Sequence, residues 1–105
     1  MPTVTVSKQD LCDLIGKRMS ETSLKTALEM TKVTFEAIDG DEIALEVTSD
    51  RPDLLSAEGI SRELRGLLGI ETGLKRYKVN RSNVVLDVDR SVKAVRPCIV
   101  SAVVE

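Results

Sequence analysis

The spacing of apolar residues changes along this chain, and that change restricts the fold more than any other feature. Residues 33–47 have apolar side chains at every second position, which is the repeat of a half-buried strand. The turn Asp39-Gly40-Asp41 divides them into two runs, and Asp-Gly between alternating runs is among the strongest short-range hairpin signals. The sequence therefore predicts a β-hairpin. Its inward positions are Val33, Phe35, Ala37, Ile43, Leu45 and Val47, and its outward face carries Glu42 and Glu46.

On both sides of the hairpin the apolar spacing is three and four, as on one face of a helix. Three such stripes occur: Leu11, Leu14 and Ile15; Leu24, Ala27 and Leu28; and Ile60, Leu64, Leu67 and Leu68. Ser7 and Ser20 are placed to cap the first two helices, and Asp53 or Ser56 can cap the third. Gly16 and Gly69 are placed to end the first and the third helix. Two short helices before the hairpin are marginal alone, so they must share a core with it.

Further strands are expected outside this group. Thr3-Val4-Thr5-Val6 alternates and predicts a short strand at the start. Residues 71–83 are polar and basic and predict a linker, after which residues 84–88 and 99–104 predict two more strands. The fold class is therefore α+β, with a helix–helix–β-hairpin–helix module over residues 1–80. Residues 81–105 are expected to be the linker and first strands of a second domain, and the apolar end of the chain indicates a piece cut from a longer protein.

Composition excludes several classes of function. The 105 residues contain no histidine, and neither cysteine has a basic neighbour, so we expect no catalytic residue and no metal site. The glycines match no phosphate-binding fingerprint. Cys12 and Cys98 are expected to be two reduced, buried side chains, with a disulfide as the alternative. No apolar run is long enough for a membrane helix, and the first residues do not have the pattern of a signal peptide.

Charge is distributed unevenly behind the net value of −2. Residues 1–50 hold five basic and ten acidic side chains, whereas residues 51–105 hold ten basic and seven acidic ones. A basic bias of this kind suits a phosphate backbone or an acidic protein surface, although an exposed solvated face is the favoured explanation.

Several blocks of the sequence resemble one family. These are residues 1–6, residues 46–60 (EVTSDRPDLLSAEGI), residues 64–70 (LRGLLGI) and residues 91–97 (SVKAVRP). Together they are similar to the N-terminal region of the archaeal and eukaryotic phenylalanine–tRNA ligase beta subunit. The resemblance implies a noncatalytic first domain, similar to a later winged-helix-like domain of that subunit, followed by strands that lead into an editing domain.

The resemblance also implies the setting of the parent enzyme. That enzyme would be a cytoplasmic class II aminoacyl-tRNA synthetase that attaches phenylalanine to tRNA(Phe) with ATP and Mg²⁺. It would be an α2β2 heterotetramer whose alpha subunit holds the synthetic active site, so this chain would need no cofactor of its own. The alternative is a free-standing winged-helix-type module that binds nucleic acid, and an independent enzyme is the least favoured interpretation.

Four residues are candidates for contact with tRNA or with another subunit: Arg51, Asp53, Arg62 and Arg65. For each, a structural role competes with the functional one. Arg51 can pair with a carboxylate, Asp53 can cap the third helix, and Arg62 can pair with Glu58 four residues earlier. The structural role is the favoured interpretation for Arg51 and Asp53, and a position on the exposed surface is the favoured one for Arg62 and Arg65.

Overall fold

The computed structural model describes residues 1–104, which divide into two units: Met1–Leu74 and a second unit that begins at Lys75. We call residues 1–74 the compact unit and residues 75–104 the C-terminal segment. The compact unit contains a three-stranded sheet and three α-helices, so the predicted α+β class is confirmed.

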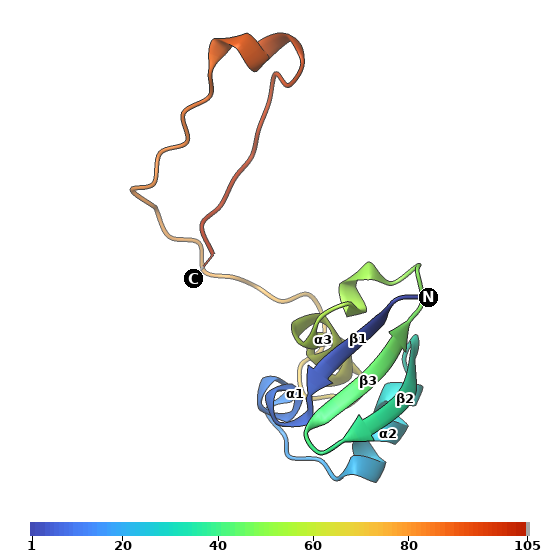
Figure 1. Ribbon diagram of the computed structural model, residues 1–105. Helices are drawn as coiled ribbons and strands as arrows, with labels where there is room; N and C mark the ends of the chain where they lie inside the picture. Colours follow the sequence, from blue (N-terminus) through green and yellow to red (C-terminus); the bar gives the residue numbers. More distant parts are fainter. Residues whose placement is uncertain (105) are drawn as a thin grey trace. The chain divides into compact units, whose positions relative to one another are not determined.

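The sheet is antiparallel, and its strand order is β1-β3-β2 (Figure 1). The predicted hairpin is formed by β2 (Val33–Asp39) and β3 (Glu42–Val47). Gly40 in the turn has φ of 57°, a left-handed conformation that glycine adopts without strain. The first strand, β1 (Thr3–Ser7), pairs with β3 in a register that sets Thr3 opposite Glu46. The predicted strand at the start of the sequence therefore forms an edge of the sheet.

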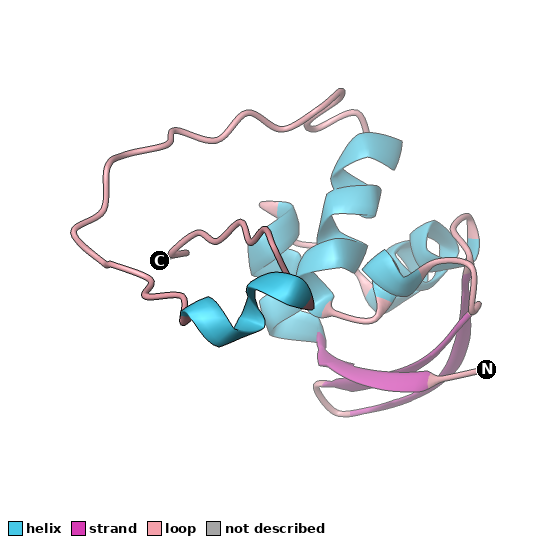
Figure 2. Cartoon of the chain, turned by 90° about the horizontal axis from the view of Figure 1, so that it is seen from above, coloured by secondary structure: helices cyan, strands magenta, loops and turns pink. Residues whose placement is uncertain are grey.

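The helices are α1 (Lys8–Ile15), α2 (Glu21–Glu29) and α3 (Ala57–Leu67), with a short 3-10 helix, η1 (Pro52–Leu54), before α3. All three α-helices lie on one face of the sheet (Figures 1 and 2). The hydroxyls of Ser7, Ser20 and Ser56 each accept a hydrogen bond from the backbone N–H three residues ahead, which confirms the serine caps. Ser56, and not Asp53, is thus the cap of α3.

One aliphatic core lies between the sheet and the helices. Its members share exposures of 6% or less: Val6, Leu11, Ile15, Leu24, Ala27, Leu28, Val33, Ile43, Leu45, Val47, Leu54, Ile60 and Leu64. The expected helical stripes were wrong at two positions, since Leu14 is 36% and Leu67 43% exposed. Each lies at the edge of its stripe, where the helix has turned away from the sheet.

The alternation predicted for β2 breaks in the middle of the strand. Its register against β3 shifts between Phe35 and Ala37, which is the signature of a β-bulge. Beyond the bulge the inward position passes to Ile38, which packs against the core, while Ala37 is exposed. An extra residue on one strand of a pair exchanges the two faces of the strand, so Ala37 was wrongly expected to face inward.

The C-terminal segment contradicts two expectations. Its described residues contain no strand: residues 84–88 and 99–104 are irregular, and the regular element is a 3-10 helix, η2 (Arg90–Ala94). Val84, Leu86 and Val88 are more than half exposed. Cys98 is exposed as well, so only Cys12 fits the expected burial, and both thiols are free. These apolar side chains have no partner strand within the described residues, and alternation without a partner does not form a sheet.

Candidate functional site

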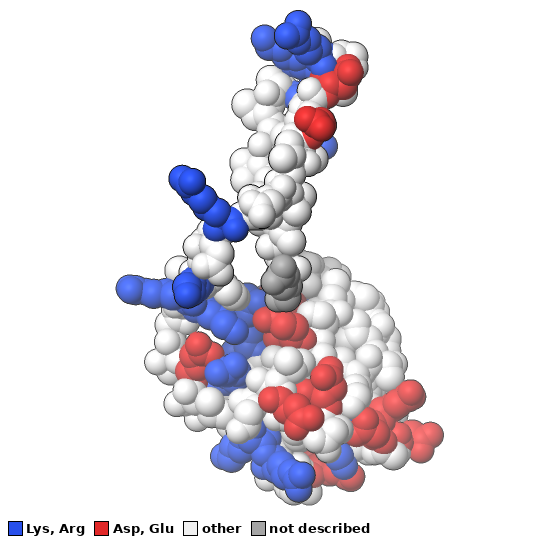
Figure 3. All heavy atoms as spheres, turned by 90° about the vertical axis from the view of Figure 1, so that its left-hand side faces the viewer, with Lys and Arg blue, Asp and Glu red and all other residues white. Residues whose placement is uncertain are grey.

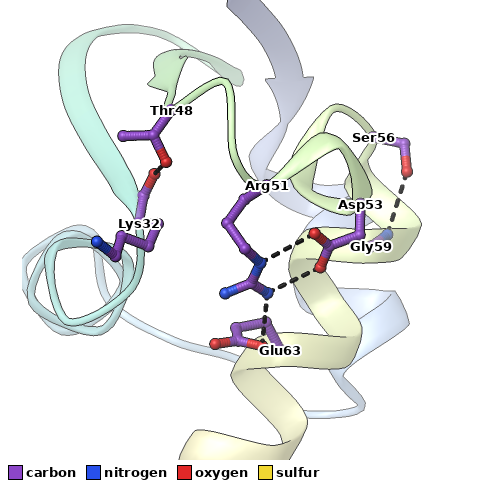
Figure 4. A network of polar contacts seen from close by, with 7 residues as sticks. All are labelled: Lys32, Thr48, Arg51, Asp53, Ser56, Gly59 and Glu63. Carbon is purple, nitrogen blue, oxygen red and sulfur yellow. Dashed lines mark hydrogen bonds and ion pairs between the residues drawn. The ribbon is translucent and has the colours of Figure 1, made fainter.

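Arg51 lies at the centre of a small ionic cluster between η1 and α3 (Figure 4). Its Nε and Nη2 donate to the two carboxylate oxygens of Asp53 at 2.9 and 2.8 Å, which is a bidentate pair. Its Nη2 also donates to Oε2 of Glu63 at 3.1 Å. The side chain of Arg51 is 28% exposed, whereas those of Asp53 and Glu63 are 56% and 38% exposed. Arg51 therefore joins the loop before α3 to the second turn of that helix.

The same loop touches α3 through its backbone. A Cβ built on Gly59 would lie 1.7 Å from the carbonyl oxygen of Asp53, a distance that no real side chain tolerates. Glycine at position 59 is thus required for the loop to approach the helix. Ser56 caps α3 at Gly59, and the buried Leu54 anchors η1 in the core. These contacts fix the position of Asp53, and Asp53 in turn orients the guanidinium of Arg51.

The cluster changes the acidity of its members. Hydrogen bonds from the Arg51 guanidinium lower the pKa of the Asp53 carboxyl below its ordinary value of 3.8. The carboxylates of Asp53 and Glu63 raise the pKa of Arg51 above its ordinary value. Both groups therefore stay charged at neutral pH, so neither is suited to exchange a proton in a reaction.

The other two candidate arginines are also held by carboxylates. The Nη2 of Arg62 donates to the two carboxylate oxygens of Glu58 at 2.6 and 2.8 Å, which confirms the predicted pairing four residues apart. The Nη2 of Arg65 lies 2.7 Å from Oε2 of Glu71, beyond the end of α3. The Nε of Arg65 is buried and has no hydrogen-bond partner among the described residues.

The structure brings three of the four candidates together. Asp53 and Arg62 line one hollow on α3, along with Glu58, Gly59 and Glu63. Arg51 forms ion pairs with two of these lining residues, Asp53 and Glu63. Arg65 does not line the hollow. Sequence reasoning missed Glu63, which faces Arg51 from 12 positions away, and the close approach at Gly59. Contact of any of the four residues with tRNA or with another subunit stays a prediction.

Asp41, in the hairpin turn, forms a second polar link that the sequence did not reveal. Its carboxylate accepts from the Ser7 hydroxyl at 2.5 Å and from the backbone N–H of Gln9 at 2.9 Å. Its backbone carbonyl accepts from the N–H of Lys8 at 2.7 Å. The turn therefore holds the first residues of α1, where a negative charge is also favoured by the helix dipole. The hydrogen bond from Ser7, and then that from Gln9, lowers the pKa of Asp41.

Charges differ between the two units. The compact unit contains eight basic and fourteen acidic side chains, and its visible face in Figure 3 carries both signs. The C-terminal segment contains seven basic side chains and only Asp87 and Asp89 as acids. Within residues 1–104, no group of three or more histidine, cysteine, aspartate or glutamate side chains is arranged to hold a metal ion. None of the helices described is long and apolar enough to cross a membrane.

Comparison with known proteins gives a consistent result. The chain is 44% identical over 104 residues to the phenylalanine–tRNA ligase beta subunit of Methanocella arvoryzae, and 41% identical over 107 residues to that of Methanopyrus kandleri. Each alignment covers 99% of this chain but only 19% and 18% of the relative. The chain thus spans about a fifth of the length of the curated relatives it matches. No family model matches the sequence.

A solved structure agrees with these alignments. A crystal structure of an N-terminal fragment of the phenylalanyl-tRNA synthetase beta subunit from Pyrococcus horikoshii has a TM-score of 0.78 and 37% identity to this chain. The match covers 91% of this chain and 29% of the fragment. The expected resemblance is confirmed: nearly from end to end, the chain matches the N-terminal region of the phenylalanine–tRNA ligase beta subunit.

Proposed function

We propose that this chain is the noncatalytic N-terminal domain of a phenylalanine–tRNA ligase beta subunit, and that it serves as an interaction domain within the synthetase. The observation that carries the proposal is the alignment of 99% of the chain with about a fifth of ligase beta subunits. The parent is then a class II synthetase that joins phenylalanine to tRNA(Phe) with ATP and Mg²⁺. Its partners are the alpha subunit, in an α2β2 assembly, and tRNA(Phe), and its compartment is the cytoplasm.

The proposed division of the chain into two domains follows from how its residues pack. Residues 1–80 contain the whole aliphatic core and form the first domain. Residues 81–105 supply the beginning of a second domain, which continues further along the parent subunit. The exposed aliphatic side chains of the C-terminal segment support this division, because so many of them in one short segment, with Val100 at 97% exposure, are typical of a surface that another part of a protein covers.

The ion pairs of the compact unit support an interaction role in which the shape of the surface matters more than its charge. Arg51, Arg62 and Arg65 each lie within 3.1 Å of a carboxylate oxygen, so their charges are largely compensated within the domain. Arg51 holds the loop of residues 51–55 against α3, and the surface of this loop, which includes the exposed Leu55, is suited to contact a neighbouring domain or subunit.

A winged-helix-like nucleic-acid-binding module is the second candidate. It is favoured by the strand order β1-β3-β2 with α1 and α2 inserted between the first two strands of the sequence. In such a fold, a helix of this pair would enter the groove of a duplex. The charge of α2 argues against that use, since the helix begins at Glu21, ends at Glu29 and contains Lys25, whose ammonium lies 5.2 Å from the centre of the Phe35 ring. The role as an interaction domain is therefore better supported than nucleic-acid binding.

The test is to express the full-length beta subunit with and without residues 1–80, each together with the alpha subunit. We expect the truncated subunit to lose α2β2 assembly or phenylalanylation of tRNA(Phe), measured by gel filtration and by charging assays. Circular dichroism of the truncated subunit provides the control that the remaining domains are folded. Unchanged assembly together with unchanged charging would refute the interaction role.

A further inference from the structure

Residues 75–81 form the densest group of positive charge in the chain. The stretch reads Lys75-Arg76-Tyr77-Lys78-Val79-Asn80-Arg81, with four cations, one aromatic residue and no acid. All seven residues are exposed and lie in neither a helix nor a strand. Tyr77 is 65% exposed, and the ammonium of Lys75 lies 5.5 Å from the centre of its ring.

These cations differ from Arg51, Arg62 and Arg65, each of which is held by a carboxylate. Within the described part of the C-terminal segment, none of the four forms an ion pair. The acids of this segment are Asp87 and Asp89, and the carboxylate of Asp89 accepts from the backbone N–H of Ser91. Four cations and an aromatic face are thus available to a ligand.

The pattern fits single-stranded nucleic acid better than other anionic partners. Cations that follow a phosphate backbone, with an aromatic ring on which a base stacks, are the usual means of binding a single strand. Seven extended residues reach at most about 25 Å, enough to follow several phosphates.

Two alternative partners fit less well. A membrane surface would favour an amphipathic helix with a continuous apolar face, and residues 75–81 are not helical. An acidic protein surface would engage the four cations but would leave the exposed ring of Tyr77 without a role.

We propose that residues 75–81 are a contact site for single-stranded RNA, in which Lys75, Arg76, Lys78 and Arg81 follow the phosphates and Tyr77 stacks on a base. The choice of RNA over DNA rests on the proposed function, because a subunit of a tRNA ligase meets unpaired tRNA ends and loops. The site lies outside the four residues considered from the sequence alone, Arg51, Asp53, Arg62 and Arg65.

The experiment uses the 105-residue chain and a fluorescein-labelled uridine RNA of about twelve nucleotides, a length within the usual range of single-strand sites. Binding is measured by fluorescence anisotropy between low and moderate salt. Contacts to about four phosphates predict a slope of log K against log salt near −3. No binding at low salt would overturn the proposal.

A triple variant within the stretch tests the phosphate contacts. Lys75→Ser, Arg76→Ser and Lys78→Ser together remove three charges, and we expect the salt slope to become shallower by about 2, because fewer counterions are released on binding.

A second triple variant is the matched control for charge. Arg90→Ser, Lys93→Ser and Arg96→Ser remove the same charge from η2 and from the residues after it. We expect this variant to keep the salt slope of the unmodified chain. Equal losses in the two triple variants would mean that binding follows net charge alone, which overturns the proposal.

Tyr77 tests the stacking separately. We expect Tyr77→Ala to weaken binding at least about 5-fold and Tyr77→Phe to retain it, because only the ring is needed for stacking. Equal binding by all three proteins would overturn the stacking role. Tighter binding of the chain to vesicles of phosphatidylserine and phosphatidylcholine than to the RNA at the same salt would overturn the assignment of the site to RNA. A failure here would leave the truncation test of the full beta subunit unaffected, so the two proposals fail separately.

Discussion

The same aliphatic alternation occurs in both units of this chain and has opposite outcomes. In β3, Ile43, Leu45 and Val47 have no exposed surface, whereas Val84, Leu86 and Val88 in the C-terminal segment are 69%, 53% and 53% exposed. The first run has a strand on each side and three helices over one face. The second run has neither among the described residues. A pattern of apolar residues therefore predicts a strand only where the chain also supplies the partners that cover it.

The largest expected effect separates the two units by stability. Leu64→Ala removes a fully buried side chain from the core, so we expect the free energy of unfolding to fall by about 2–5 kcal/mol. Val100→Ala removes a smaller apolar side chain that is 97% exposed, and its effect should stay within about 0.5 kcal/mol. Urea denaturation of both variants provides the measurement. Similar losses of stability in the two variants would show that Val100 is also part of a core, which would contradict the difference between the two units.

The second prediction examines why the loop before α3 belongs to the compact unit. Gly59→Ala places a Cβ against the Asp53 carbonyl, and the backbone must shift, at a cost of about 1–3 kcal/mol or more. Gly66→Ala lies on the same helix, and its added Cβ would come no closer than 3.9 Å to its nearest neighbour, the Glu71 carbonyl oxygen. This control should be neutral or more stable by up to about 1 kcal/mol. Thermal unfolding measures both variants. A Gly59→Ala protein as stable as the unmodified chain would contradict the close approach of the Asp53 carbonyl to Gly59.

A smaller effect is expected at the start of α3. Ser56→Ala removes the hydroxyl that accepts from the Gly59 N–H, and loss of such a cap costs about 1 kcal/mol. Ser82→Ala is the counterpart in the C-terminal segment, where the hydroxyl accepts from the Val84 N–H. The midpoint of denaturation should change only for Ser56→Ala. A change of equal size at Ser82 would mean that both units unfold as one.

The smallest effect depends on pH. The folded pKa of Asp53 lies below its ordinary value of 3.8, so its ion pair with Arg51 stabilises the fold above that pH and the contribution is lost as the pH falls. Asp53→Asn should lower the melting temperature slightly at pH 7, by less than about 5 °C, and the difference should disappear in acid. Asp89, whose pKa is lowered by Ser91, is the matched acid in the other unit. A melting temperature that changes with Asp89→Asn as it does with Asp53→Asn would contradict the distinction.

Local features were predictable because they depend on neighbours in the sequence. The caps at Ser7 and Ser20, the turn at Gly40 and the pairing of Arg62 with Glu58 all involve residues at most four positions apart. Three other contacts join distant parts of the chain. They are the pairing of β1 with β3, the hydrogen bond from Arg51 to Glu63, and the hydrogen bond from the Gln9 N–H at the start of α1 to Asp41. No periodicity encodes such contacts, and the bulge in β2 depends on the partner strand as much as on its own residues.

Of the candidate site, the sequence indicated the residues but not their surroundings. Arg51 and Asp53 are conspicuous beside Pro52, yet only the fold shows that the guanidinium is shared with Glu63. The basic stretch at residues 75–81 was visible as composition, and its exposure could be established only with the structure.

The position of β1 has a consequence for how the domain is made on the ribosome. Thr3 leaves the exit tunnel about 40 residues before its partner Glu46, and Leu64 on α3 closes the core later still. The nascent chain must therefore hold the residues of β1 unpaired through most of the synthesis of the domain. A pause in translation before Glu46 has emerged would leave β1 without its partner strand and open to pairing with other chains, whereas a pause after Leu74 has emerged would not.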